Sequence, residues 1–214
     1  MFHPDKRRRS RRLTITQENH ATPPLILASS SRYRADLLKR LGLTFSQISP
    51  DINENPRAGE TPEKLAWRLA TEKARAVATK HPGSLVIGSD QVASLDGIAL
   101  GKPGTTIKAR RQLSLCSGKS VHFYTGLCLA GPNIGQQCTL VDTFTVHFRK
   151  LGADQISRYI EKEQPLDCAG SFKMEGLGIS LFERLEGKDP NSLIGLPLID
   201  LVSLLNQRYG FAIP

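Results

Sequence analysis

Residues 84–103 have the sequence SLVIGSDQVASLDGIALGKP, and this stretch predicts the centre of a β-sheet. Its first residues are mainly apolar and lead to a polar group that contains Asp90, as expected of a buried central strand. The pair Asp96-Gly97 is a strong indication of a two-residue turn, so the chain is expected to fold back as a β-hairpin. The sequence therefore predicts a central strand that carries a carboxylate at its polar end.

The predicted hairpin brings charged residues of its two strands near each other. With a two-residue turn, Lys102 opposes Gln91, one position from Asp90. A carboxylate fixed at the polar end of a buried strand suits a general base or a metal ligand, and a neighbouring cation suits a phosphate. A bulge would move these side chains to different faces, and a surface ion pair is the alternative interpretation. Gly88 allows close approach of another backbone or of a ligand.

Further strands and helices are predicted on both sides of this hairpin. Before it we expect a strand, a serine-rich turn, a helix, an extended segment and a long helix, at residues 25–27, 29–31, 32–41, 44–49 and 61–81. After it we expect a helix, two strands, a helix and a glycine-rich loop too flexible for regular structure, at residues 106–116, 121–129, 139–148, 153–163 and 170–178. One more strand and a terminal helix follow. Because strands and helices alternate imperfectly, an α/β fold with a mixed sheet is favoured over a purely parallel one.

The length of 214 residues, 39% of them hydrophobic, suffices for one sizeable domain or for two small lobes that share a cleft. We expect residues 1–23 to be a basic, disordered leader and residues 24–214 to form the domain. A nucleic-acid-binding or targeting arm is the alternative for the leader. Since no run of about 18 apolar residues occurs, we expect no membrane partner and a cytoplasmic protein.

The net charge of +9 indicates an anionic partner, which could be nucleic acid, a membrane surface or a phosphorylated small molecule. The leader holds six Lys and Arg residues against Asp5 and Glu18, so about half of this charge lies in the leader. Aromatic residues make up only 6% of the chain, which offers few side chains on which single-stranded nucleic acid could stack. Composition alone does not choose among these three partners, although the low aromatic content makes a nucleic acid the least favoured of them.

Two positions outside the hairpin carry residues suited to phosphate. Ser31 precedes a predicted helix whose first turn contains Arg34, so free backbone N–H groups and a guanidinium could bind an anion there. A serine at such a position can equally be no more than a helix cap. Lys73 lies on the apolar face of the long predicted helix, four residues after Leu69. Its ammonium either extends past apolar surface into water or binds phosphate in a cleft.

The sequence resembles the Maf family of nucleoside triphosphate pyrophosphatases. Six segments carry the resemblance, in order from Leu25 to the C-terminus: LILASSSRYRADLLKRLG, ATEKARAV, VIGSDQVASLDGIALGKP, FYTGL, DCAGSFKMEGLG and NSLIGLPL. The resemblance implies the Maf/Ham1 (ITPase-like) fold, an elongated mixed sheet with flanking helices and a central cleft between two lobes. It also implies hydrolysis of a nucleoside triphosphate between the α- and β-phosphates with a divalent cation, Mg²⁺ or Mn²⁺.

The same resemblance implies roles for particular residues. Asp90 matches the proton acceptor of the family. Glu54 matches a carboxylate near the metal, which Asp90 would also contact, although this chain has Asn53-Glu54 where the family often has Asp-Glu. The positions that hold the triphosphate correspond to Ser31, Arg34, Lys73 and Lys102.

The GSDQ and GSFKMEG motifs resemble the branch of the family that acts on 7-methyl-GTP, and the specificity positions correspond to Tyr33, Gln91 and Glu175. Methylation of N7 makes guanine cationic, so an aromatic face such as Tyr33 gains a cation–π interaction of about 0.5–2 kcal/mol. A carboxylate such as Glu175 can accept hydrogen bonds from the guanine N1–H and 2-amino group. The alternatives are a pyrophosphatase for dTTP or UTP, a nucleotide-binding regulator of cell division, and an RNA-binding protein. A homodimer is compatible with the sequence.

Overall fold

The described residues form a mixed α/β structure around a single sheet. The computed structural model describes residues 22–132 and 137–214, so the predicted leader lies outside the described residues apart from Thr22 and Pro23. Within these ranges, seven strands have the order β2-β1-β3-β5-β6-β7, with β4 paired to β3. The strands are β1 (Leu25–Ala28), β2 (Ser46–Ile48), β3 (Leu85–Leu95), β4 (Ile98–Leu100), β5 (Ser120–Ala130), β6 (Cys138–Phe148) and β7 (Phe182–Gly187).

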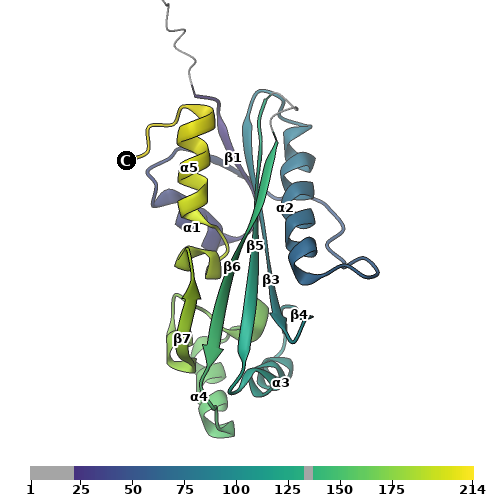
Figure 1. Ribbon diagram of the computed structural model, residues 1–214, viewed down its shortest axis with the longest axis vertical. Coiled ribbons are helices and arrows are strands. Elements are labelled where there is room, and N and C mark those ends of the chain that lie inside the picture. Colours follow the sequence, from purple (N-terminus) through teal and green to yellow (C-terminus); the bar gives the residue numbers. More distant parts are fainter. Residues whose placement is uncertain (1–21, 133–136) are drawn as a thin grey trace, which may run out of the picture.

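The sheet is mixed, as predicted. β1 is parallel to β2 and to β3, whereas the pairs that β3 forms with β4 and β5, and the pairs farther along the sheet, are antiparallel. Figure 1 shows the long strands running through the length of the molecule, with α2 on one side of them and α1 and α5 on the other. The other two helices, α3 and α4, lie toward the far end of the sheet. The helices are α1 (Arg32–Lys39), α2 (Pro62–Ala78), α3 (Thr106–Cys116), α4 (Ala153–Glu163) and α5 (Leu198–Tyr209).

Capping side chains mark where the helices begin, and tighter turns mark where they end. The Oγ1 atom of Thr61 accepts a hydrogen bond from the N–H of Lys64 at 3.3 Å, which satisfies one free donor at the start of α2. The predicted bounds of α3 and α4 are confirmed at both ends. The predicted ends of α1 and α2 are two to three residues too long, because the chain finishes each helix in a tighter turn with i to i−3 bonds such as His81 N–H to Ala78 C=O. Among the described residues, we find no helix whose length and hydropathy suffice to cross a bilayer.

The hairpin forms with the predicted register. Asp96 and Gly97 have φ values of 52° and 79°, which suit a two-residue turn between twisted strands. Ala93 pairs with Leu100, in agreement with the predicted register. The ladder ends at this pair, however, so Lys102 lies beyond it and the expected pairing with Gln91 does not form.

Gly88 is a point of close approach between β3 and α2. A Cβ atom on Gly88 would lie 2.3 Å from the carbonyl oxygen of Ala70, and one on Gly126 of β5 would lie 2.3 Å from that of Ala66. Of the two alternatives that the sequence leaves for Gly88, the structure supports the approach of another backbone. α2 therefore lies directly on the centre of the sheet, and Lys73 lies close to the polar part of β3.

The hydrophobic core divides into parts toward the two ends of the sheet, and β3 and β5 contribute to both. One part surrounds Phe123, whose ring meets that of Phe172 edge-to-face with a centroid separation of 5.2 Å. Another part contains Leu27, Leu38 and Leu85. This division agrees with the expectation of two lobes.

The expectation that residues 170–178 lack regular structure holds for residues 172–176, which form no helix or strand, but is wrong at both ends of the segment. Its two ends belong to the 3₁₀ helices η2 (Ala169–Ser171) and η3 (Leu177–Leu181). The segment is fixed because the Phe172 ring is buried among other rings and the hydroxyl of Tyr159 accepts the N–H of Lys173 at 3.0 Å.

Candidate active site

A gap beside one edge of β3 forms the centre of the candidate site. β5 pairs with β3 along residues 86–94. On the opposite edge, β1 pairs with residues 85–88 and β4 with residues 93–95. Residues 89–92 thus have no strand neighbour on that edge within the described part of the chain. Ligands of α/β proteins commonly bind where neighbouring strands diverge in this way.

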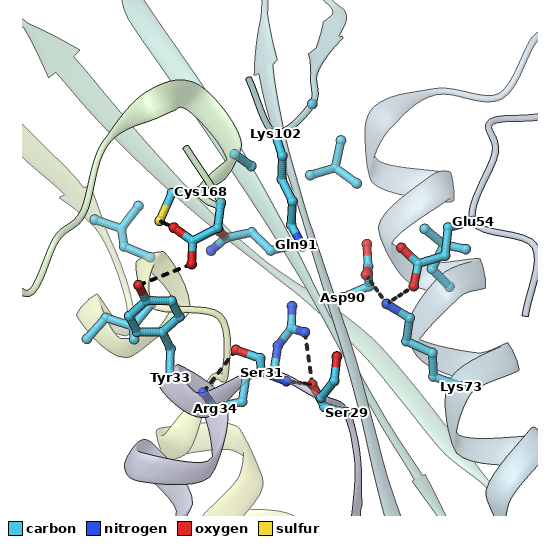
Figure 2. Close-up of a pocket in the computed structure, with 18 of the residues that line it drawn as sticks. Ser29, Ser31, Tyr33, Arg34, Glu54, Lys73, Asp90, Gln91, Lys102 and Cys168 are labelled. Atoms are coloured by element: carbon cyan, nitrogen blue, oxygen red, sulfur yellow. Dashed lines mark hydrogen bonds and ion pairs between the residues drawn. The ribbon is translucent and has the colours of Figure 1, made fainter. Parts of the chain in front are cut away.

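A cavity of about 770 Å³ lies at this gap (Figure 2). The N-terminus of α1, the face of α2 and the segment after β2 contribute to its wall, and so do the chain after β4 and residues 167–175. Every residue that the sequence predicts for catalysis, phosphate, metal or specificity lines it: Ser31, Tyr33, Arg34, Glu54, Lys73, Asp90, Gln91, Lys102 and Glu175. The fold therefore brings together side chains that are far apart in the sequence.

Lys73 connects two of the carboxylates that line the cavity. Its side chain is only 8% exposed, and its Nζ lies 2.6 Å from Oδ1 of Asp90 and 2.8 Å from Oε1 of Glu54. The alternative in which its ammonium extends into bulk water is therefore wrong. A buried ammonium needs such partners, because an isolated charge is costly to remove from water. The pair fixes the direction of the Asp90 carboxylate at the floor of the cavity.

Ser31 and Arg34 occupy the first turn of α1. The Ser31 hydroxyl caps this helix by accepting the N–H of Arg34 at 3.4 Å. The guanidinium of Arg34 donates from Nε to the carbonyl of Gly195 at 2.7 Å and from Nη1 to the hydroxyl of Ser29 at 3.3 Å. Burial lowers the pKa of Arg34, and the negative charges of Asp90 and Glu54 oppose this shift. The positive end of α1 and a fixed guanidinium thus face the same cavity.

Lys102 supplies a third cation. It follows β4, points toward the centre of the cavity (Figure 2), and has no hydrogen bond or ion pair with any residue of the described ranges. Burial raises the pKa of Glu54, but the hydrogen bond from Lys73 and the charges of Lys73, Lys102 and Arg34 outweigh burial and lower it. The centre of the cavity is therefore a positive field suited to a polyphosphate.

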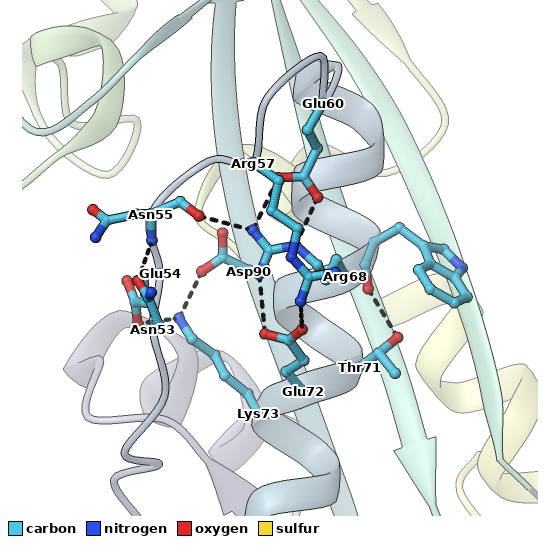
Figure 3. Close-up of polar contacts among 11 residues, drawn as sticks. Asn53, Glu54, Asn55, Arg57, Glu60, Arg68, Thr71, Glu72, Lys73 and Asp90 are labelled. Carbon is cyan, nitrogen blue, oxygen red and sulfur yellow. Dashed lines mark hydrogen bonds and ion pairs between the residues drawn. The ribbon is translucent and has the colours of Figure 1, made fainter.

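Arg68 fastens the segment that carries Glu54 to α2 (Figure 3). Its guanidinium makes two bonds to the carboxylate of Glu60, at 2.6 and 2.9 Å, and it also donates to the carbonyl of Asn55 at 3.0 Å and to Glu72 at 3.0 Å. The hydrogen bond from Arg68 lowers the pKa of Glu60 to about 2. Asn55 is thereby held, and the adjacent Glu54 remains beside Lys73.

The opposite side of the cavity contains Tyr33, Gln91 and Glu175. The amide N–H of Gln91 donates to the carbonyl of Ser192 and to the hydroxyl of Thr125, so its carbonyl oxygen is the group left to accept from a ligand. The hydroxyl of Tyr33 donates to Asp167 at 3.4 Å. This side therefore presents an aromatic ring together with hydrogen-bond acceptors.

Glu54 and Asp90 are carboxylates of the cavity wall that could contact a divalent cation, provided that other groups supply its remaining ligands. The described residues contain no group of three or more His, Cys, Asp or Glu side chains that could hold a metal by themselves. Mg²⁺ commonly takes one or two protein carboxylates and fills its other positions with water and phosphate oxygens. Both carboxylates contact the same Lys73 ammonium, so they lie at the same part of the cavity wall.

Several residues of this site were not predicted from the sequence. Asp167 belongs to the segment DCAGSFKMEGLG, and Gly195 belongs to NSLIGLPL, but both segments support only the family resemblance. The one local indication for Arg68 is Glu72 four residues later, a spacing at which opposite charges pair on a helix. The carbonyl of Gly195 accepts from Arg34 and from the Ser89 hydroxyl.

A buried carboxylate among cationic side chains, in a cavity at a gap in an α/β sheet, defines the class of enzymes that act on phosphorylated small molecules. Within this class, the chain belongs to the Maf family: residues 24–208 match the family described as Maf-like protein.

Several bacterial relatives are similar over most of their length. A 7-methyl-GTP pyrophosphatase of Nitrosococcus oceani is 56% identical over 187 residues, which cover 87% of this chain and 94% of the relative. The protein of the same name in Pseudomonas aeruginosa is 57% identical, over 90% of this chain and 100% of the relative. That of Vibrio cholerae is 58% identical, over 86% of this chain and 95% of the relative.

Proposed function

We propose that this protein is a nucleoside triphosphate pyrophosphatase that hydrolyses 7-methyl-GTP to 7-methyl-GMP and pyrophosphate. The observation that carries the proposal is the arrangement of Asp90 and three cationic side chains, Arg34, Lys73 and Lys102, around one cavity. A carboxylate can activate water, and fixed cations stabilise charge on a polyphosphate. The names of the relatives described above support 7-methyl-GTP as the substrate.

In this proposal, Asp90 takes a proton from a water molecule while the oxygen of that water attacks the α-phosphorus. The bond between the α-phosphorus and the oxygen that bridges to the β-phosphorus breaks, and pyrophosphate leaves. Arg34, Lys102 and the N-terminus of α1 at Ser31 stabilise the negative charge on the phosphate oxygens. Lys73 donates to Asp90 and keeps its carboxylate directed toward the water.

We infer that the carboxylates of Glu54 and Asp90 would hold Mg²⁺ or Mn²⁺ when the nucleotide is bound. When bound, the cation neutralises charge on the phosphate oxygens. Arg68 supports this inference indirectly, because it holds the segment that carries Glu54 against α2.

Pyrophosphate release from a panel of nucleotides tests the proposed function. We expect the purified protein with Mg²⁺ to have its highest kcat/KM on 7-methyl-GTP, to produce the monophosphate, and to lose turnover when a chelator is added. GTP, dTTP and UTP serve as the comparison substrates. A higher kcat/KM on dTTP or UTP contradicts the proposed substrate and supports a pyrimidine nucleotide pyrophosphatase. Nucleotide binding without turnover of any nucleotide supports a regulator instead.

Replacement of Glu175 by Gln tests its predicted role in recognition of the base. The change keeps the size of the side chain and removes the charge that would accept hydrogen bonds from guanine. We expect kcat/KM on 7-methyl-GTP to fall by about 10- to 100-fold, the range for loss of a charged hydrogen bond, with little change on UTP. The matched control is Glu183→Gln, an exposed residue of β7 outside the cavity. Equal losses on both nucleotides would rule out recognition of the base by Glu175.

A further inference from the structure

The cavity has charges of opposite sign at its two sides. The side that contains Arg34, Lys73 and Lys102 has three cations against the carboxylates of Glu54 and Asp90, so it has a net positive charge. Figure 2 shows Tyr33 and Cys168 on the other side, away from Lys73 and Glu54. Asp167 and Glu175 also line the cavity, and both negative charges raise the pKa of the Cys168 thiol, which places them near this second side. A nucleotide whose triphosphate lies on the positive side therefore places its base near two carboxylates.

Asp167 forms a hydrogen bond with Tyr33, the aromatic residue of this second side. Its Oδ2 atom accepts from the hydroxyl of Tyr33 at 3.4 Å, and its Oδ1 atom accepts from the thiol of Cys168 at 3.4 Å. Burial, followed by the negative charge of Asp167, raises the pKa of the Cys168 thiol to about 12. The thiol is therefore neutral. Asp167 makes no ion pair within 4 Å among the described residues, and the cation that acts on it is Arg32, which donates to the same Tyr33 hydroxyl.

A cation of the protein itself already rests on the Tyr33 ring. The guanidinium carbon of Arg32 lies 4.8 Å from the centre of this ring, and Nη2 of Arg32 donates to the Tyr33 hydroxyl at 3.0 Å. Arg32 is exposed, so its side chain is free to move away when a ligand enters. The other cation of this region, Lys173, donates instead to the carbonyl of Glu163 at 2.7 Å. The place beside Tyr33 and Asp167 is thus occupied by a flat cationic group of the protein itself.

We propose that Asp167 is a further specificity-determining residue, whose carboxylate attracts the positively charged base of the nucleotide beside the ring of Tyr33. The inference rests on the proposed function, because it assumes that the triphosphate occupies the positive side of the cavity. N7-methylated guanine is flat and cationic, whereas guanine has nearly the same shape and no charge. A carboxylate discriminates between the two by charge, which Tyr33 alone does less strongly.

Asp167→Asn tests this inference, because the amide keeps the shape of the side chain and an acceptor for the Tyr33 hydroxyl. The measured quantity is the ratio of kcat/KM on 7-methyl-GTP to kcat/KM on GTP. We expect the variant to lower this ratio by about tenfold, mainly through KM, as for removal of one nearby charge in a partly exposed site. The effect should shrink at high salt, since exposed charges are screened. Asp167→Glu, which restores the charge, should recover most of the ratio.

Asp36→Asn is the matched control, because Asp36 is an exposed carboxylate of the same helix as Tyr33, lies outside the cavity wall and pairs with Lys39. A ratio in Asp167→Asn equal to that of the wild type overturns the inference and leaves the proposed function intact. If this unchanged ratio comes with an equal loss of kcat/KM on both nucleotides, Asp167 has a general structural role instead. A wild-type protein that turns over neither nucleotide overturns the proposed function and this inference together.

Discussion

Asp90→Asn is expected to lower kcat on 7-methyl-GTP by about 10²- to 10⁴-fold, the usual contribution of a general base. The amide has nearly the same shape as the carboxylate but cannot take a proton from water. Asp90 is 8% exposed and lies at the gap between the strands that flank β3, so no bulk buffer group can easily replace it. The expected loss corresponds to about 2.7–5.5 kcal/mol of transition-state stabilisation.

The same substitution should have a smaller effect on folding. Lys73 loses a charged partner at 2.6 Å but keeps Glu54 at 2.8 Å, and the amide oxygen of Asn can still accept a hydrogen bond. We therefore expect the free energy of unfolding to fall by about 1–3 kcal/mol, the range for one charged hydrogen bond. Thermal unfolding of each sample, measured beside the kinetics, separates the two effects.

Asp96→Asn is the control for Asp90→Asn. This substitution removes the same charge, at the turn of the same hairpin. Asp96 is 67% exposed, pairs with Lys119 and lies outside the cavity. Asn tolerates the positive φ of this position, so the turn should be preserved. A folded Asp90→Asn protein with wild-type kcat would exclude Asp90 as the base.

Local sequence patterns were sufficient to predict most of the elements. The turn at Asp96-Gly97 was predictable because few residue pairs adopt positive φ at both central positions, and the register then follows from the turn length. The position of Lys73 on an apolar face was predictable from helical spacing. Its partners were not, because they depend on how closely α2 lies on β3 and on where the segment before α2 is held.

The gap that forms the candidate site depends on long-range pairing. Nothing in residues 84–103 indicates that β1 stops at Ala28, opposite Gly88, or that β4 begins to pair only at Ala93. Asp167 likewise meets Tyr33 across 134 positions of sequence. The family resemblance identified several of the residues that line the cavity, but not Asp167, and it gave neither the bridge formed by Lys73 nor the support that Arg68 gives to Glu54.

Gly88→Ala is expected to destabilise the protein by about 3 kcal/mol, the upper part of the usual range for overpacking. The added methyl group would lie 2.3 Å from the carbonyl oxygen of Ala70 and 2.6 Å from the backbone nitrogen of Ala74. Both atoms belong to the backbone of α2, so the contact cannot be relieved by a change of side-chain rotamer. The helix must move away from the sheet, which exposes part of the apolar face that it buries.

The same movement should reduce turnover, because α2 carries Lys73 and β3 carries Asp90. Separation of the two elements lengthens the 2.6 Å contact between their side chains and frees the Asp90 carboxylate to change direction. We therefore expect kcat to fall even in the fraction of Gly88→Ala that remains folded at low temperature.

Gly83→Ala is the matched control. Apart from the two adjacent residues, no atom lies within 4 Å of the added methyl group, so the free energy of unfolding should change by less than about 1 kcal/mol. Denaturant unfolding and steady-state kinetics of both variants give the comparison. Equal stability and equal kcat in Gly88→Ala and Gly83→Ala would contradict the close packing of α2 on β3 as the feature that positions Lys73.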